Sequence, residues 1–168
     1  MRRQMLVAVI AAGGLALLSV GGRAADEKVP LDKVPEKISA AINGRFPGAE
    51  LKSVEKENDD GKIMFDIELT QKGRKYEMDV KEDGTIVEIE KEVAAKDFSA
   101  ACADAVKKNY PKAMIKDIME VNKVEGTKET PIHYEVTLED QDKKETEIVV
   151  SLDGKSAAPE KPEAPPGK

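Results

Sequence analysis

The sequence predicts an α+β protein of two tandem repeats, each an N-terminal helix packed on a three- to four-stranded antiparallel sheet. The first observation is a phrase that occurs twice: residues 46–54 read FPGAELKSV, and residues 110–118 read YPKAMIKDI. In both copies, apolar residues recur at helical spacing before the proline and alternate with polar residues after it. This change of period, from about 3.6 to about 2, predicts a helix followed by strands in each repeat.

Each repeat begins with a predicted helix of about three turns, because an apolar stripe at this spacing marks one buried helix face. Pro47 and Pro111 end the helices, since the residue before a proline is pushed out of the helical region. Cys102 occupies the position of Ile38 in the other copy, which predicts a small buried apolar residue rather than a reactive thiol. The matching stripes are Val34, Ile38, Ala41, Ile42 and Phe46, then Phe98, Cys102, Ala105, Val106 and Tyr110.

Alternating segments after each proline predict antiparallel strands that are buried on one face and solvated on the other. Turns such as Lys72-Gly73 and Asp83-Gly84 separate these strands as in β-hairpins, and Asp153-Gly154 matches the second of them. The positions predicted to face the core are Ile63, Phe65, Ile67, Leu69, Tyr76, Met78 and Val80, then Ile132, Tyr134, Val136, Leu138, Thr146, Ile148 and Val150.

The strand directly after each proline is irregular. Leu51 and Val54 are three positions apart, as are Ile115 and Ile118. Strict alternation would place the two members of each pair on opposite faces. We therefore expect a β-bulge or a strong twist at this point in both repeats.

The predicted repeats span residues 34–93 and 98–157. The first hairpin of the second repeat is longer (Val124 to Pro131), and its last strand is truncated, because the chain passes directly into a proline-rich segment. Residues 158–168 lack apolar periodicity, which predicts a polar, disordered tail. A spacer or wall-associated segment is the alternative for this tail.

Residues 1–24 are a predicted signal peptide. Two arginines near the start precede an apolar or small stretch from Leu6 to Val20, and small residues precede a cleavage site after Ala24. The alternative is an uncleaved membrane anchor, but a spanning helix needs about 20 apolar residues. We therefore expect a periplasmic or secreted protein without stable membrane insertion after cleavage.

The charge balance restricts the partners. Without residues 1–24, 24 Lys and Arg face 33 Asp and Glu, which is a net charge of −9. Nucleic acids and anionic membrane surfaces need positive charge and are therefore not expected as partners. A basic protein, a cation or solubility alone can account for this charge. Cys102 is the only cysteine, so an intramolecular disulfide cannot form.

The sequence does not contain a set of residues typical of an enzyme. His133 is the only histidine, and it alternates with core-facing neighbours, so it is predicted to face solvent. A Cys-His pair with Cys102 is not expected, because the two residues belong to unrelated elements. Gly-rich phosphate loops and nucleophile elbows are also missing. We therefore expect no catalytic residues, no metal site and no cofactor.

Carboxylates are the one group with an informative placement. Alternation puts six of them on the outer face of the first sheet, which we interpret as an acidic platform for a basic partner. Low-affinity Ca²⁺ binding and a merely solvated face are the alternatives, although Ca²⁺ takes about six to eight convergent oxygens. The six residues are Asp66, Glu68, Glu77, Asp79, Glu88 and Glu90.

The motifs as a whole resemble the PepSY and PepSY-like family of exported bacterial domains. The resemblance rests on the two amphipathic helices, on the corners FPGAEL and YPKAMI, and on strands such as KIMFDIEL, RKYEMDV and DGTIVEIE. It implies a tandem arrangement of helix-on-sheet units like that of the β-lactamase inhibitory protein. It also implies a role in binding or inhibiting extracellular enzymes, notably peptidases.

We therefore expect an exported, non-enzymatic binding or regulatory module of the inhibitor-like kind. Its partner is expected to be an extracytoplasmic protein, such as a peptidase or another secreted enzyme. Trp is absent, and all three Phe and three Tyr are assigned to the core, so the contact is expected to rely on charge rather than on aromatic anchors. Binding or sensing of Ca²⁺ in the cell envelope by the acidic face is the alternative function.

Overall fold

A computed structural model of the chain describes residues 27–59 and 62–159. The predicted signal peptide and residues 160–168 of the predicted tail lie outside the described residues. The elements are β1 (Glu27–Lys28), η1 (Leu31–Lys33), α1 (Glu36–Arg45), β2 (Glu50–Asp59), β3 (Lys62–Gln71), β4 (Arg74–Lys81), β5 (Ile86–Glu92), α2 (Ala100–Asn109), β6 (Met114–Glu125), β7 (Lys128–Glu139), β8 (Glu145–Ser151) and β9 (Ala157–Pro159).

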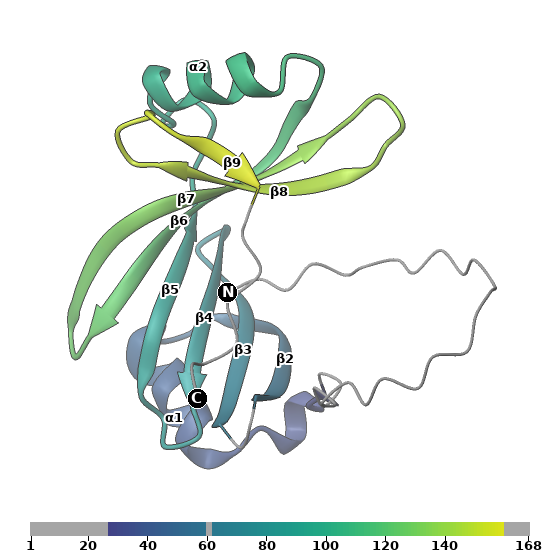
Figure 1. Cartoon of the computed structure of the whole chain (residues 1–168). Coiled ribbons are helices and arrows are strands. Elements are labelled where there is room, and N and C mark those ends of the chain that lie inside the picture. Colours follow the sequence, from purple (N-terminus) through teal and green to yellow (C-terminus); the bar gives the residue numbers. More distant parts are fainter. Residues whose placement is uncertain (1–26, 60–61, 160–168) are drawn as a thin grey trace, which may run out of the picture.

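The strands form one antiparallel sheet of nine strands, in sequence order from β1 to β9 (Figure 1). The prediction of two separate helix-on-sheet repeats was wrong on this point. β5 pairs with β6, so that Glu88 lies opposite Lys123 and Glu92 lies opposite Met119. Local alternation says which residues of a strand face the core, but not which strand lies beside it. Pairing β5 with β6 uses backbone groups that two separate sheets would leave open at their edges.

Both helices lie on the same face of this sheet. Ile89 of β5 belongs to the core under α1 and lies opposite Asn122 of β6. Ile118 is four residues before Asn122, hence on the same face, and it belongs to the core under α2. We call β1 to β5 with α1 the first half, and α2 with β6 to β9 the second half. The opposite face, which neither α1 nor α2 covers, is the open face.

Two hydrophobic clusters fill the space under the helices, and they confirm most of the two predicted stripes. Val34 and Phe98 precede their helices, however, and Ala105 is not part of the second cluster. Ile38 and Cys102 are each fully buried at equivalent positions. The first cluster consists of Ile38, Ile42, Phe46, Val54, Phe65, Ile67, Leu69, Met78, Val80, Ile89 and Val124. The second consists of Phe98, Cys102, Val106, Ile118, Val136, Leu138, Ile148 and Val150.

The predicted bulges are confirmed in both repeats. The β2–β3 register shifts between Leu51 and Ser53, and the β6–β7 register shifts between Ile115 and Asp117. The prediction for Ile132 was wrong. A further register shift leaves Ile132 as an extra residue of β7, where its side chain is 43% exposed instead of facing the core.

The two Asp-Gly turns support the first turns of the helices. A Cβ atom on Gly84 would lie 3.0 Å from the backbone oxygen of Lys37 in α1. A Cβ atom on Gly154 would lie 2.6 Å from the backbone carbon of Ala101 in α2. Both glycines have positive φ, so the turn geometry and the close approach of the helix each favour glycine.

The last strands of the two halves are β5 and β9. β5 has seven residues, and β9, at the equivalent position of the second half, has three up to Pro159, where the described residues end. The sheet twists strongly, so that α1 lies behind the strands of the first half and α2 lies above those of the second (Figure 1). Neither helix of the described ranges has the length and apolar character needed to cross a membrane.

Candidate functional site

The six predicted carboxylates lie together on the open face of β3, β4 and β5, and we call them the acidic array. Glu68 lies opposite Glu77, and Glu77 lies opposite Glu90 across the next strand pair. Their strand neighbours, such as Ile67, are in the first core, which places the carboxylates on the other face. The parallel second row consists of Asp66, Asp79 and Glu88.

The array is less solvated than an exposed sheet face would be. Glu77 is 6% exposed and Glu90 is 4% exposed, whereas the other four side chains are half-buried. The sequence-based expectation of a solvated outer face was therefore wrong for these two residues. Both lie on interior strands of the sheet, with a paired strand on either side.

One lysine lies among these carboxylates. The Nζ atom of Lys75, on β4, lies 2.9 Å from Glu77 Oε1 and 3.6 Å from Glu68 Oε1. It also lies 3.6 Å from Asp117 Oδ2 on β6, so it joins the array to the second half. Like charges directly opposite each other destabilise a sheet, and this lysine offsets part of that repulsion. The sequence-based prediction did not include Lys75. The signal that could have identified it is its position two residues before Glu77 on β4, which places both side chains on the same face.

The crowding of carboxylates changes their protonation. Burial, reinforced by the negative charges of Asp79 and Glu77, raises the pKa of Asp66 to about 7. Burial and the charge of Asp79 also raise the pKa of Glu88. With this pKa, Asp66 is partly protonated near neutral pH, which lowers its repulsion with Asp79 and Glu77.

In the described residues of the second half, the array is repeated only in part. Thr137 pairs with Glu147 where the first half pairs Glu68 with Glu77. In the neighbouring row, an uncharged Val149 lies between Glu135 and Ala158. Uncharged side chains thus replace three of the array's carboxylates: Thr137 corresponds to Glu68, Val149 to Asp79 and Ala158 to Glu88. Glu135 and Glu147 keep two of the array positions, and Glu139 lies opposite Glu145 further along the same face. The two unbroken rows of carboxylates are therefore particular to the first half among the described residues.

His133 lies on the open face, where its Nε2 atom is 3.3 Å from Glu135 Oε1. It lies opposite Val121 of β6, on the same face as the array. Cys102 lies under α2 on the other side of the sheet. The structure therefore does not bring the only histidine and the only cysteine together into a nucleophile–base pair.

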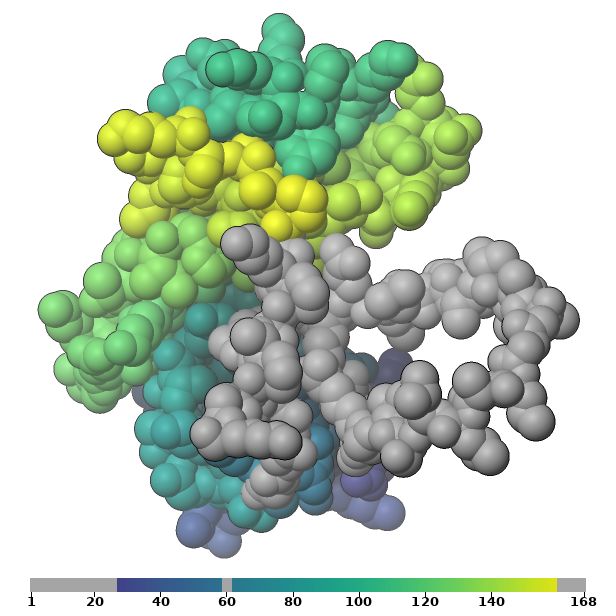
Figure 2. All heavy atoms as spheres, in the orientation of Figure 1, coloured from purple at the N-terminus to yellow at the C-terminus, as the bar shows by residue number. Residues whose placement is uncertain are grey.

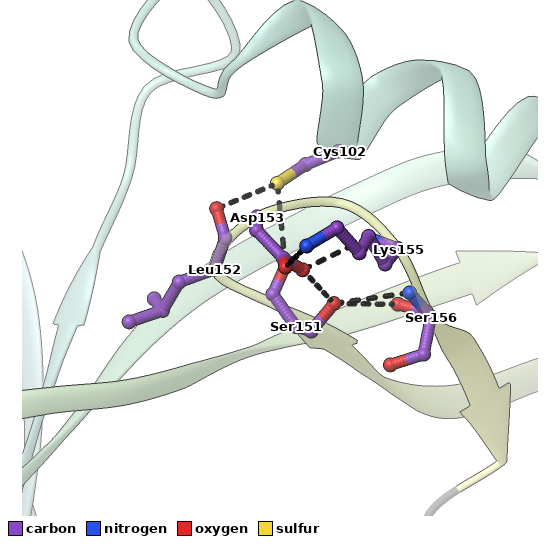
Figure 3. Close-up of polar contacts among 6 residues, drawn as sticks. All are labelled: Cys102, Ser151, Leu152, Asp153, Lys155 and Ser156. Atoms are coloured by element: carbon purple, nitrogen blue, oxygen red, sulfur yellow. Dashed lines mark hydrogen bonds and ion pairs between the residues drawn. The ribbon is translucent and has the colours of Figure 1, made fainter.

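Cys102 packs against the turn between β8 and β9 (Figure 3). Its sulfhydryl lies 3.5 Å from the carbonyl oxygen of Ser151 and 3.6 Å from that of Leu152, at the Asp-Gly turn below α2. In the same turn, the Lys155 ammonium and backbone N–H and the Ser151 hydroxyl bond to Asp153 and lower the pKa of its carboxyl to about 2. The turn is thus held by its own polar groups, and the prediction of a buried cysteine is confirmed.

Metal binding finds no support in the described part of the chain. Within residues 27–59 and 62–159, no group of three or more His, Cys, Asp or Glu side chains is arranged to hold a metal ion. The array's carboxylates are spread along three strands, whereas a Ca²⁺ site gathers about six to eight oxygens around one point.

Comparison with known families now identifies the class. The model of the family described as "Putative beta-lactamase-inhibitor-like, PepSY-like" matches the chain twice, at residues 23–88 and 64–156. The matches together cover most of the chain, so the protein belongs to this PepSY-like family. No curated protein matches the chain.

Two solved structures share the fold at low sequence identity, and a third is similar with a TM-score below 0.5. A DUF2874 family protein from Bacteroides uniformis is 14% identical, with a TM-score of 0.52 over 73% of this chain and 85% of that one. A putative periplasmic protein from Bacteroides eggerthii is 13% identical, with a TM-score of 0.53 over 71% of this chain and 83% of that one. A BLIP-like protein from Bacteroides fragilis is 17% identical, with a TM-score of 0.48 over 76% of this chain and 84% of that one.

Proposed function

We propose that this protein is a non-enzymatic binding module that acts outside the cytoplasm and captures a basic partner protein on the acidic array. The observation that carries the proposal is the placement of six carboxylates in two cross-strand rows on the face that neither helix covers. Like charges directly opposite each other cost stability. A sheet that retains this arrangement is better explained by a partner that supplies positive charge than by folding alone.

The degree of burial supports an electrostatic contact of useful strength. A half-buried carboxylate interacts with an opposite charge more strongly than a fully solvated one, because water screens it less. Positive groups of a partner would also relieve the repulsion within each row. The membership in a beta-lactamase-inhibitor-like family supports a protein partner, and a peptidase or another secreted enzyme is the class we propose.

Location outside the cytoplasm is supported by two observations. The N-terminus has the pattern of a signal peptide. A protein of the same fold is described as a putative periplasmic protein. We propose periplasmic location or secretion on this basis.

The test is affinity capture from the cell-envelope fraction with the mature protein as bait. We expect a basic protein to be retained at about 50 mM salt and released at about 500 mM, because salt screens charges across a contact. Reversing Asp66, Glu68, Glu77 and Glu88 to Lys should abolish retention. Retention that survives both the reversal and the high salt would exclude the array as the binding surface.

A matched control separates the effect of the array on retention from the effect of the overall net charge. Reversal of four exposed carboxylates outside the array changes the net charge by the same amount, and retention should persist. The control residues are Asp32, Glu82, Asp97 and Asp104. A calcium titration of the wild-type protein completes the test, since stoichiometric heat with raised thermal stability would favour cation binding instead.

A further inference from the structure

The β6–β7 hairpin is part of the second half, but the region near its tip packs against the first half. β6 and β7 have twelve residues each, whereas their counterparts β2 and β3 have ten. Val124, close to the hairpin tip, is 7% exposed and belongs to the core under α1. The hairpin lies beside the first half in both the cartoon and the space-filling view (Figures 1 and 2).

A single carboxylate joins this hairpin to two elements of the first half. Glu129 of β7 binds Arg45 through Oε1 and Lys91 through Oε2. Arg45 is the last residue of α1, and Lys91 lies on β5. The Glu129 side chain is 16% exposed, so the three elements meet at a largely buried charge.

We infer that residues 124–131 form a strap by which the second half holds the end of α1, so that local opening of one half is coupled to the other. The strap has an apolar contact, Val124 in the first core, and an ionic contact, Glu129 between two cations. Removing one partner of a largely buried ion pair leaves the others uncompensated. The ionic contact therefore resists opening more than an exposed pair would.

The same hairpin supplies an internal reference. Lys123 Nζ lies 2.8 Å from Glu125 Oε1, but these side chains are 62% and 66% exposed. Lys123 lies opposite Glu88 of β5, whereas Glu125, the residue to be changed, lies beyond the last β6 residue that pairs with β5. Glu125→Gln is thus a matched control for Glu129→Gln, since the substitution is identical and only the reach to the first half differs.

Hydrogen exchange on the full chain tests the strap. In Glu129→Gln, we expect amides at the end of α1 (residues 43–46) and in the strap to exchange at least about tenfold faster, while α2 and β8 keep wild-type rates. In Glu125→Gln, the end of α1 should keep its wild-type rate. Wild-type exchange at the end of α1 in Glu129→Gln, or equal acceleration in both variants, would overturn the inference.

A reciprocal variant keeps the test decisive if Glu129→Gln folds poorly. Arg45→Gln alters the other end of the contact, and we expect the strap amides on β7 to exchange about tenfold faster there as well. A double variant should add little to either single variant, because both remove the same interaction. Full additivity of the two effects would contradict a shared contact. None of these readouts depends on what binds the open face.

Discussion

The two halves repeat one plan beneath the helices and differ on the open face. Both have a proline-terminated helix, a bulge at the equivalent place and an Asp-Gly turn below the helix. On the open face, however, the first half carries six carboxylates, and the second half has Thr137, Val149 and Ala158 at three corresponding positions. The repeated features are those that the fold needs. The feature that is repeated only in part, the acidic array, is the better candidate for function.

Substitution of the turn glycines below the helices should have the largest effect on stability. Gly154→Ala is expected to destabilise the protein by about 3 kcal/mol, because a positive φ costs a side chain about 1–2 kcal/mol and the new Cβ would also meet the backbone of Ala101. Gly84→Ala should cost less, about 2 kcal/mol, since its nearest contact is longer. Denaturant unfolding measures both values.

Gly73 provides the control for this comparison. Its φ is also positive, but a Cβ there would meet nothing within 4 Å, so Gly73→Ala should cost about 1 kcal/mol from backbone strain alone. Equal costs for Gly154→Ala and Gly73→Ala would mean that the turn does not support α2.

The array should make stability depend on pH. An unfolded Asp titrates near pH 4, whereas the pKa of Asp66 in the folded protein is about 7. The folded state therefore binds the extra proton, and the associated stability is present below about pH 4 and lost as the pH rises through about 7. We expect Asp66→Asn to raise the free energy of unfolding by on the order of 2 kcal/mol at pH 8, with little change at pH 4.

Thermal unfolding of wild type and Asp66→Asn across this pH range measures the effect. The difference between the two proteins should grow with pH. A constant difference would show that Asp66 does not titrate in this range, and a difference that grows toward low pH would reverse the proposed sign.

The N-termini of the two helices also differ, and this difference should have a smaller effect on stability. The Ser99 hydroxyl accepts a hydrogen bond from the Cys102 N–H at 3.2 Å, whereas Pro35 gives α1 no side-chain cap. Ser99→Ala should cost about 1 kcal/mol, because one N–H at the start of α2 loses its acceptor. Ser99→Thr keeps the acceptor and should cost only a few tenths of that amount in the same unfolding assay. Similar losses for both substitutions would contradict a capping role.

Local patterns were sufficient to predict much of the fold. The helices, the strand faces and both bulges follow from the spacing of apolar residues within short segments. Pairing of β5 with β6, and the contact of Glu129 with Arg45, join residues far apart in the sequence. No local pattern encodes such contacts, which is why the single sheet was not predicted.

The candidate site was predicted in part for the same reason. Alternation along each strand was enough to group the six carboxylates on one face. The burial of Glu77 and Glu90 and the position of Lys75 between the halves depend on strand neighbours that only the structure reveals. The extra residue Ile132 likewise depends on the register between β6 and β7.

The central claim, that binding belongs to the acidic array of the first half, is tested most directly by placing residues of the second half's open face into the array. The triple variant Glu68→Thr, Asp79→Val and Glu88→Ala gives the first half the residues found at equivalent positions of the second half, where the same fold accommodates them. Its affinity for the partner identified by envelope capture should fall at least about tenfold by calorimetric titration, with an unchanged circular dichroism spectrum. Wild-type affinity in the folded triple variant would contradict the account.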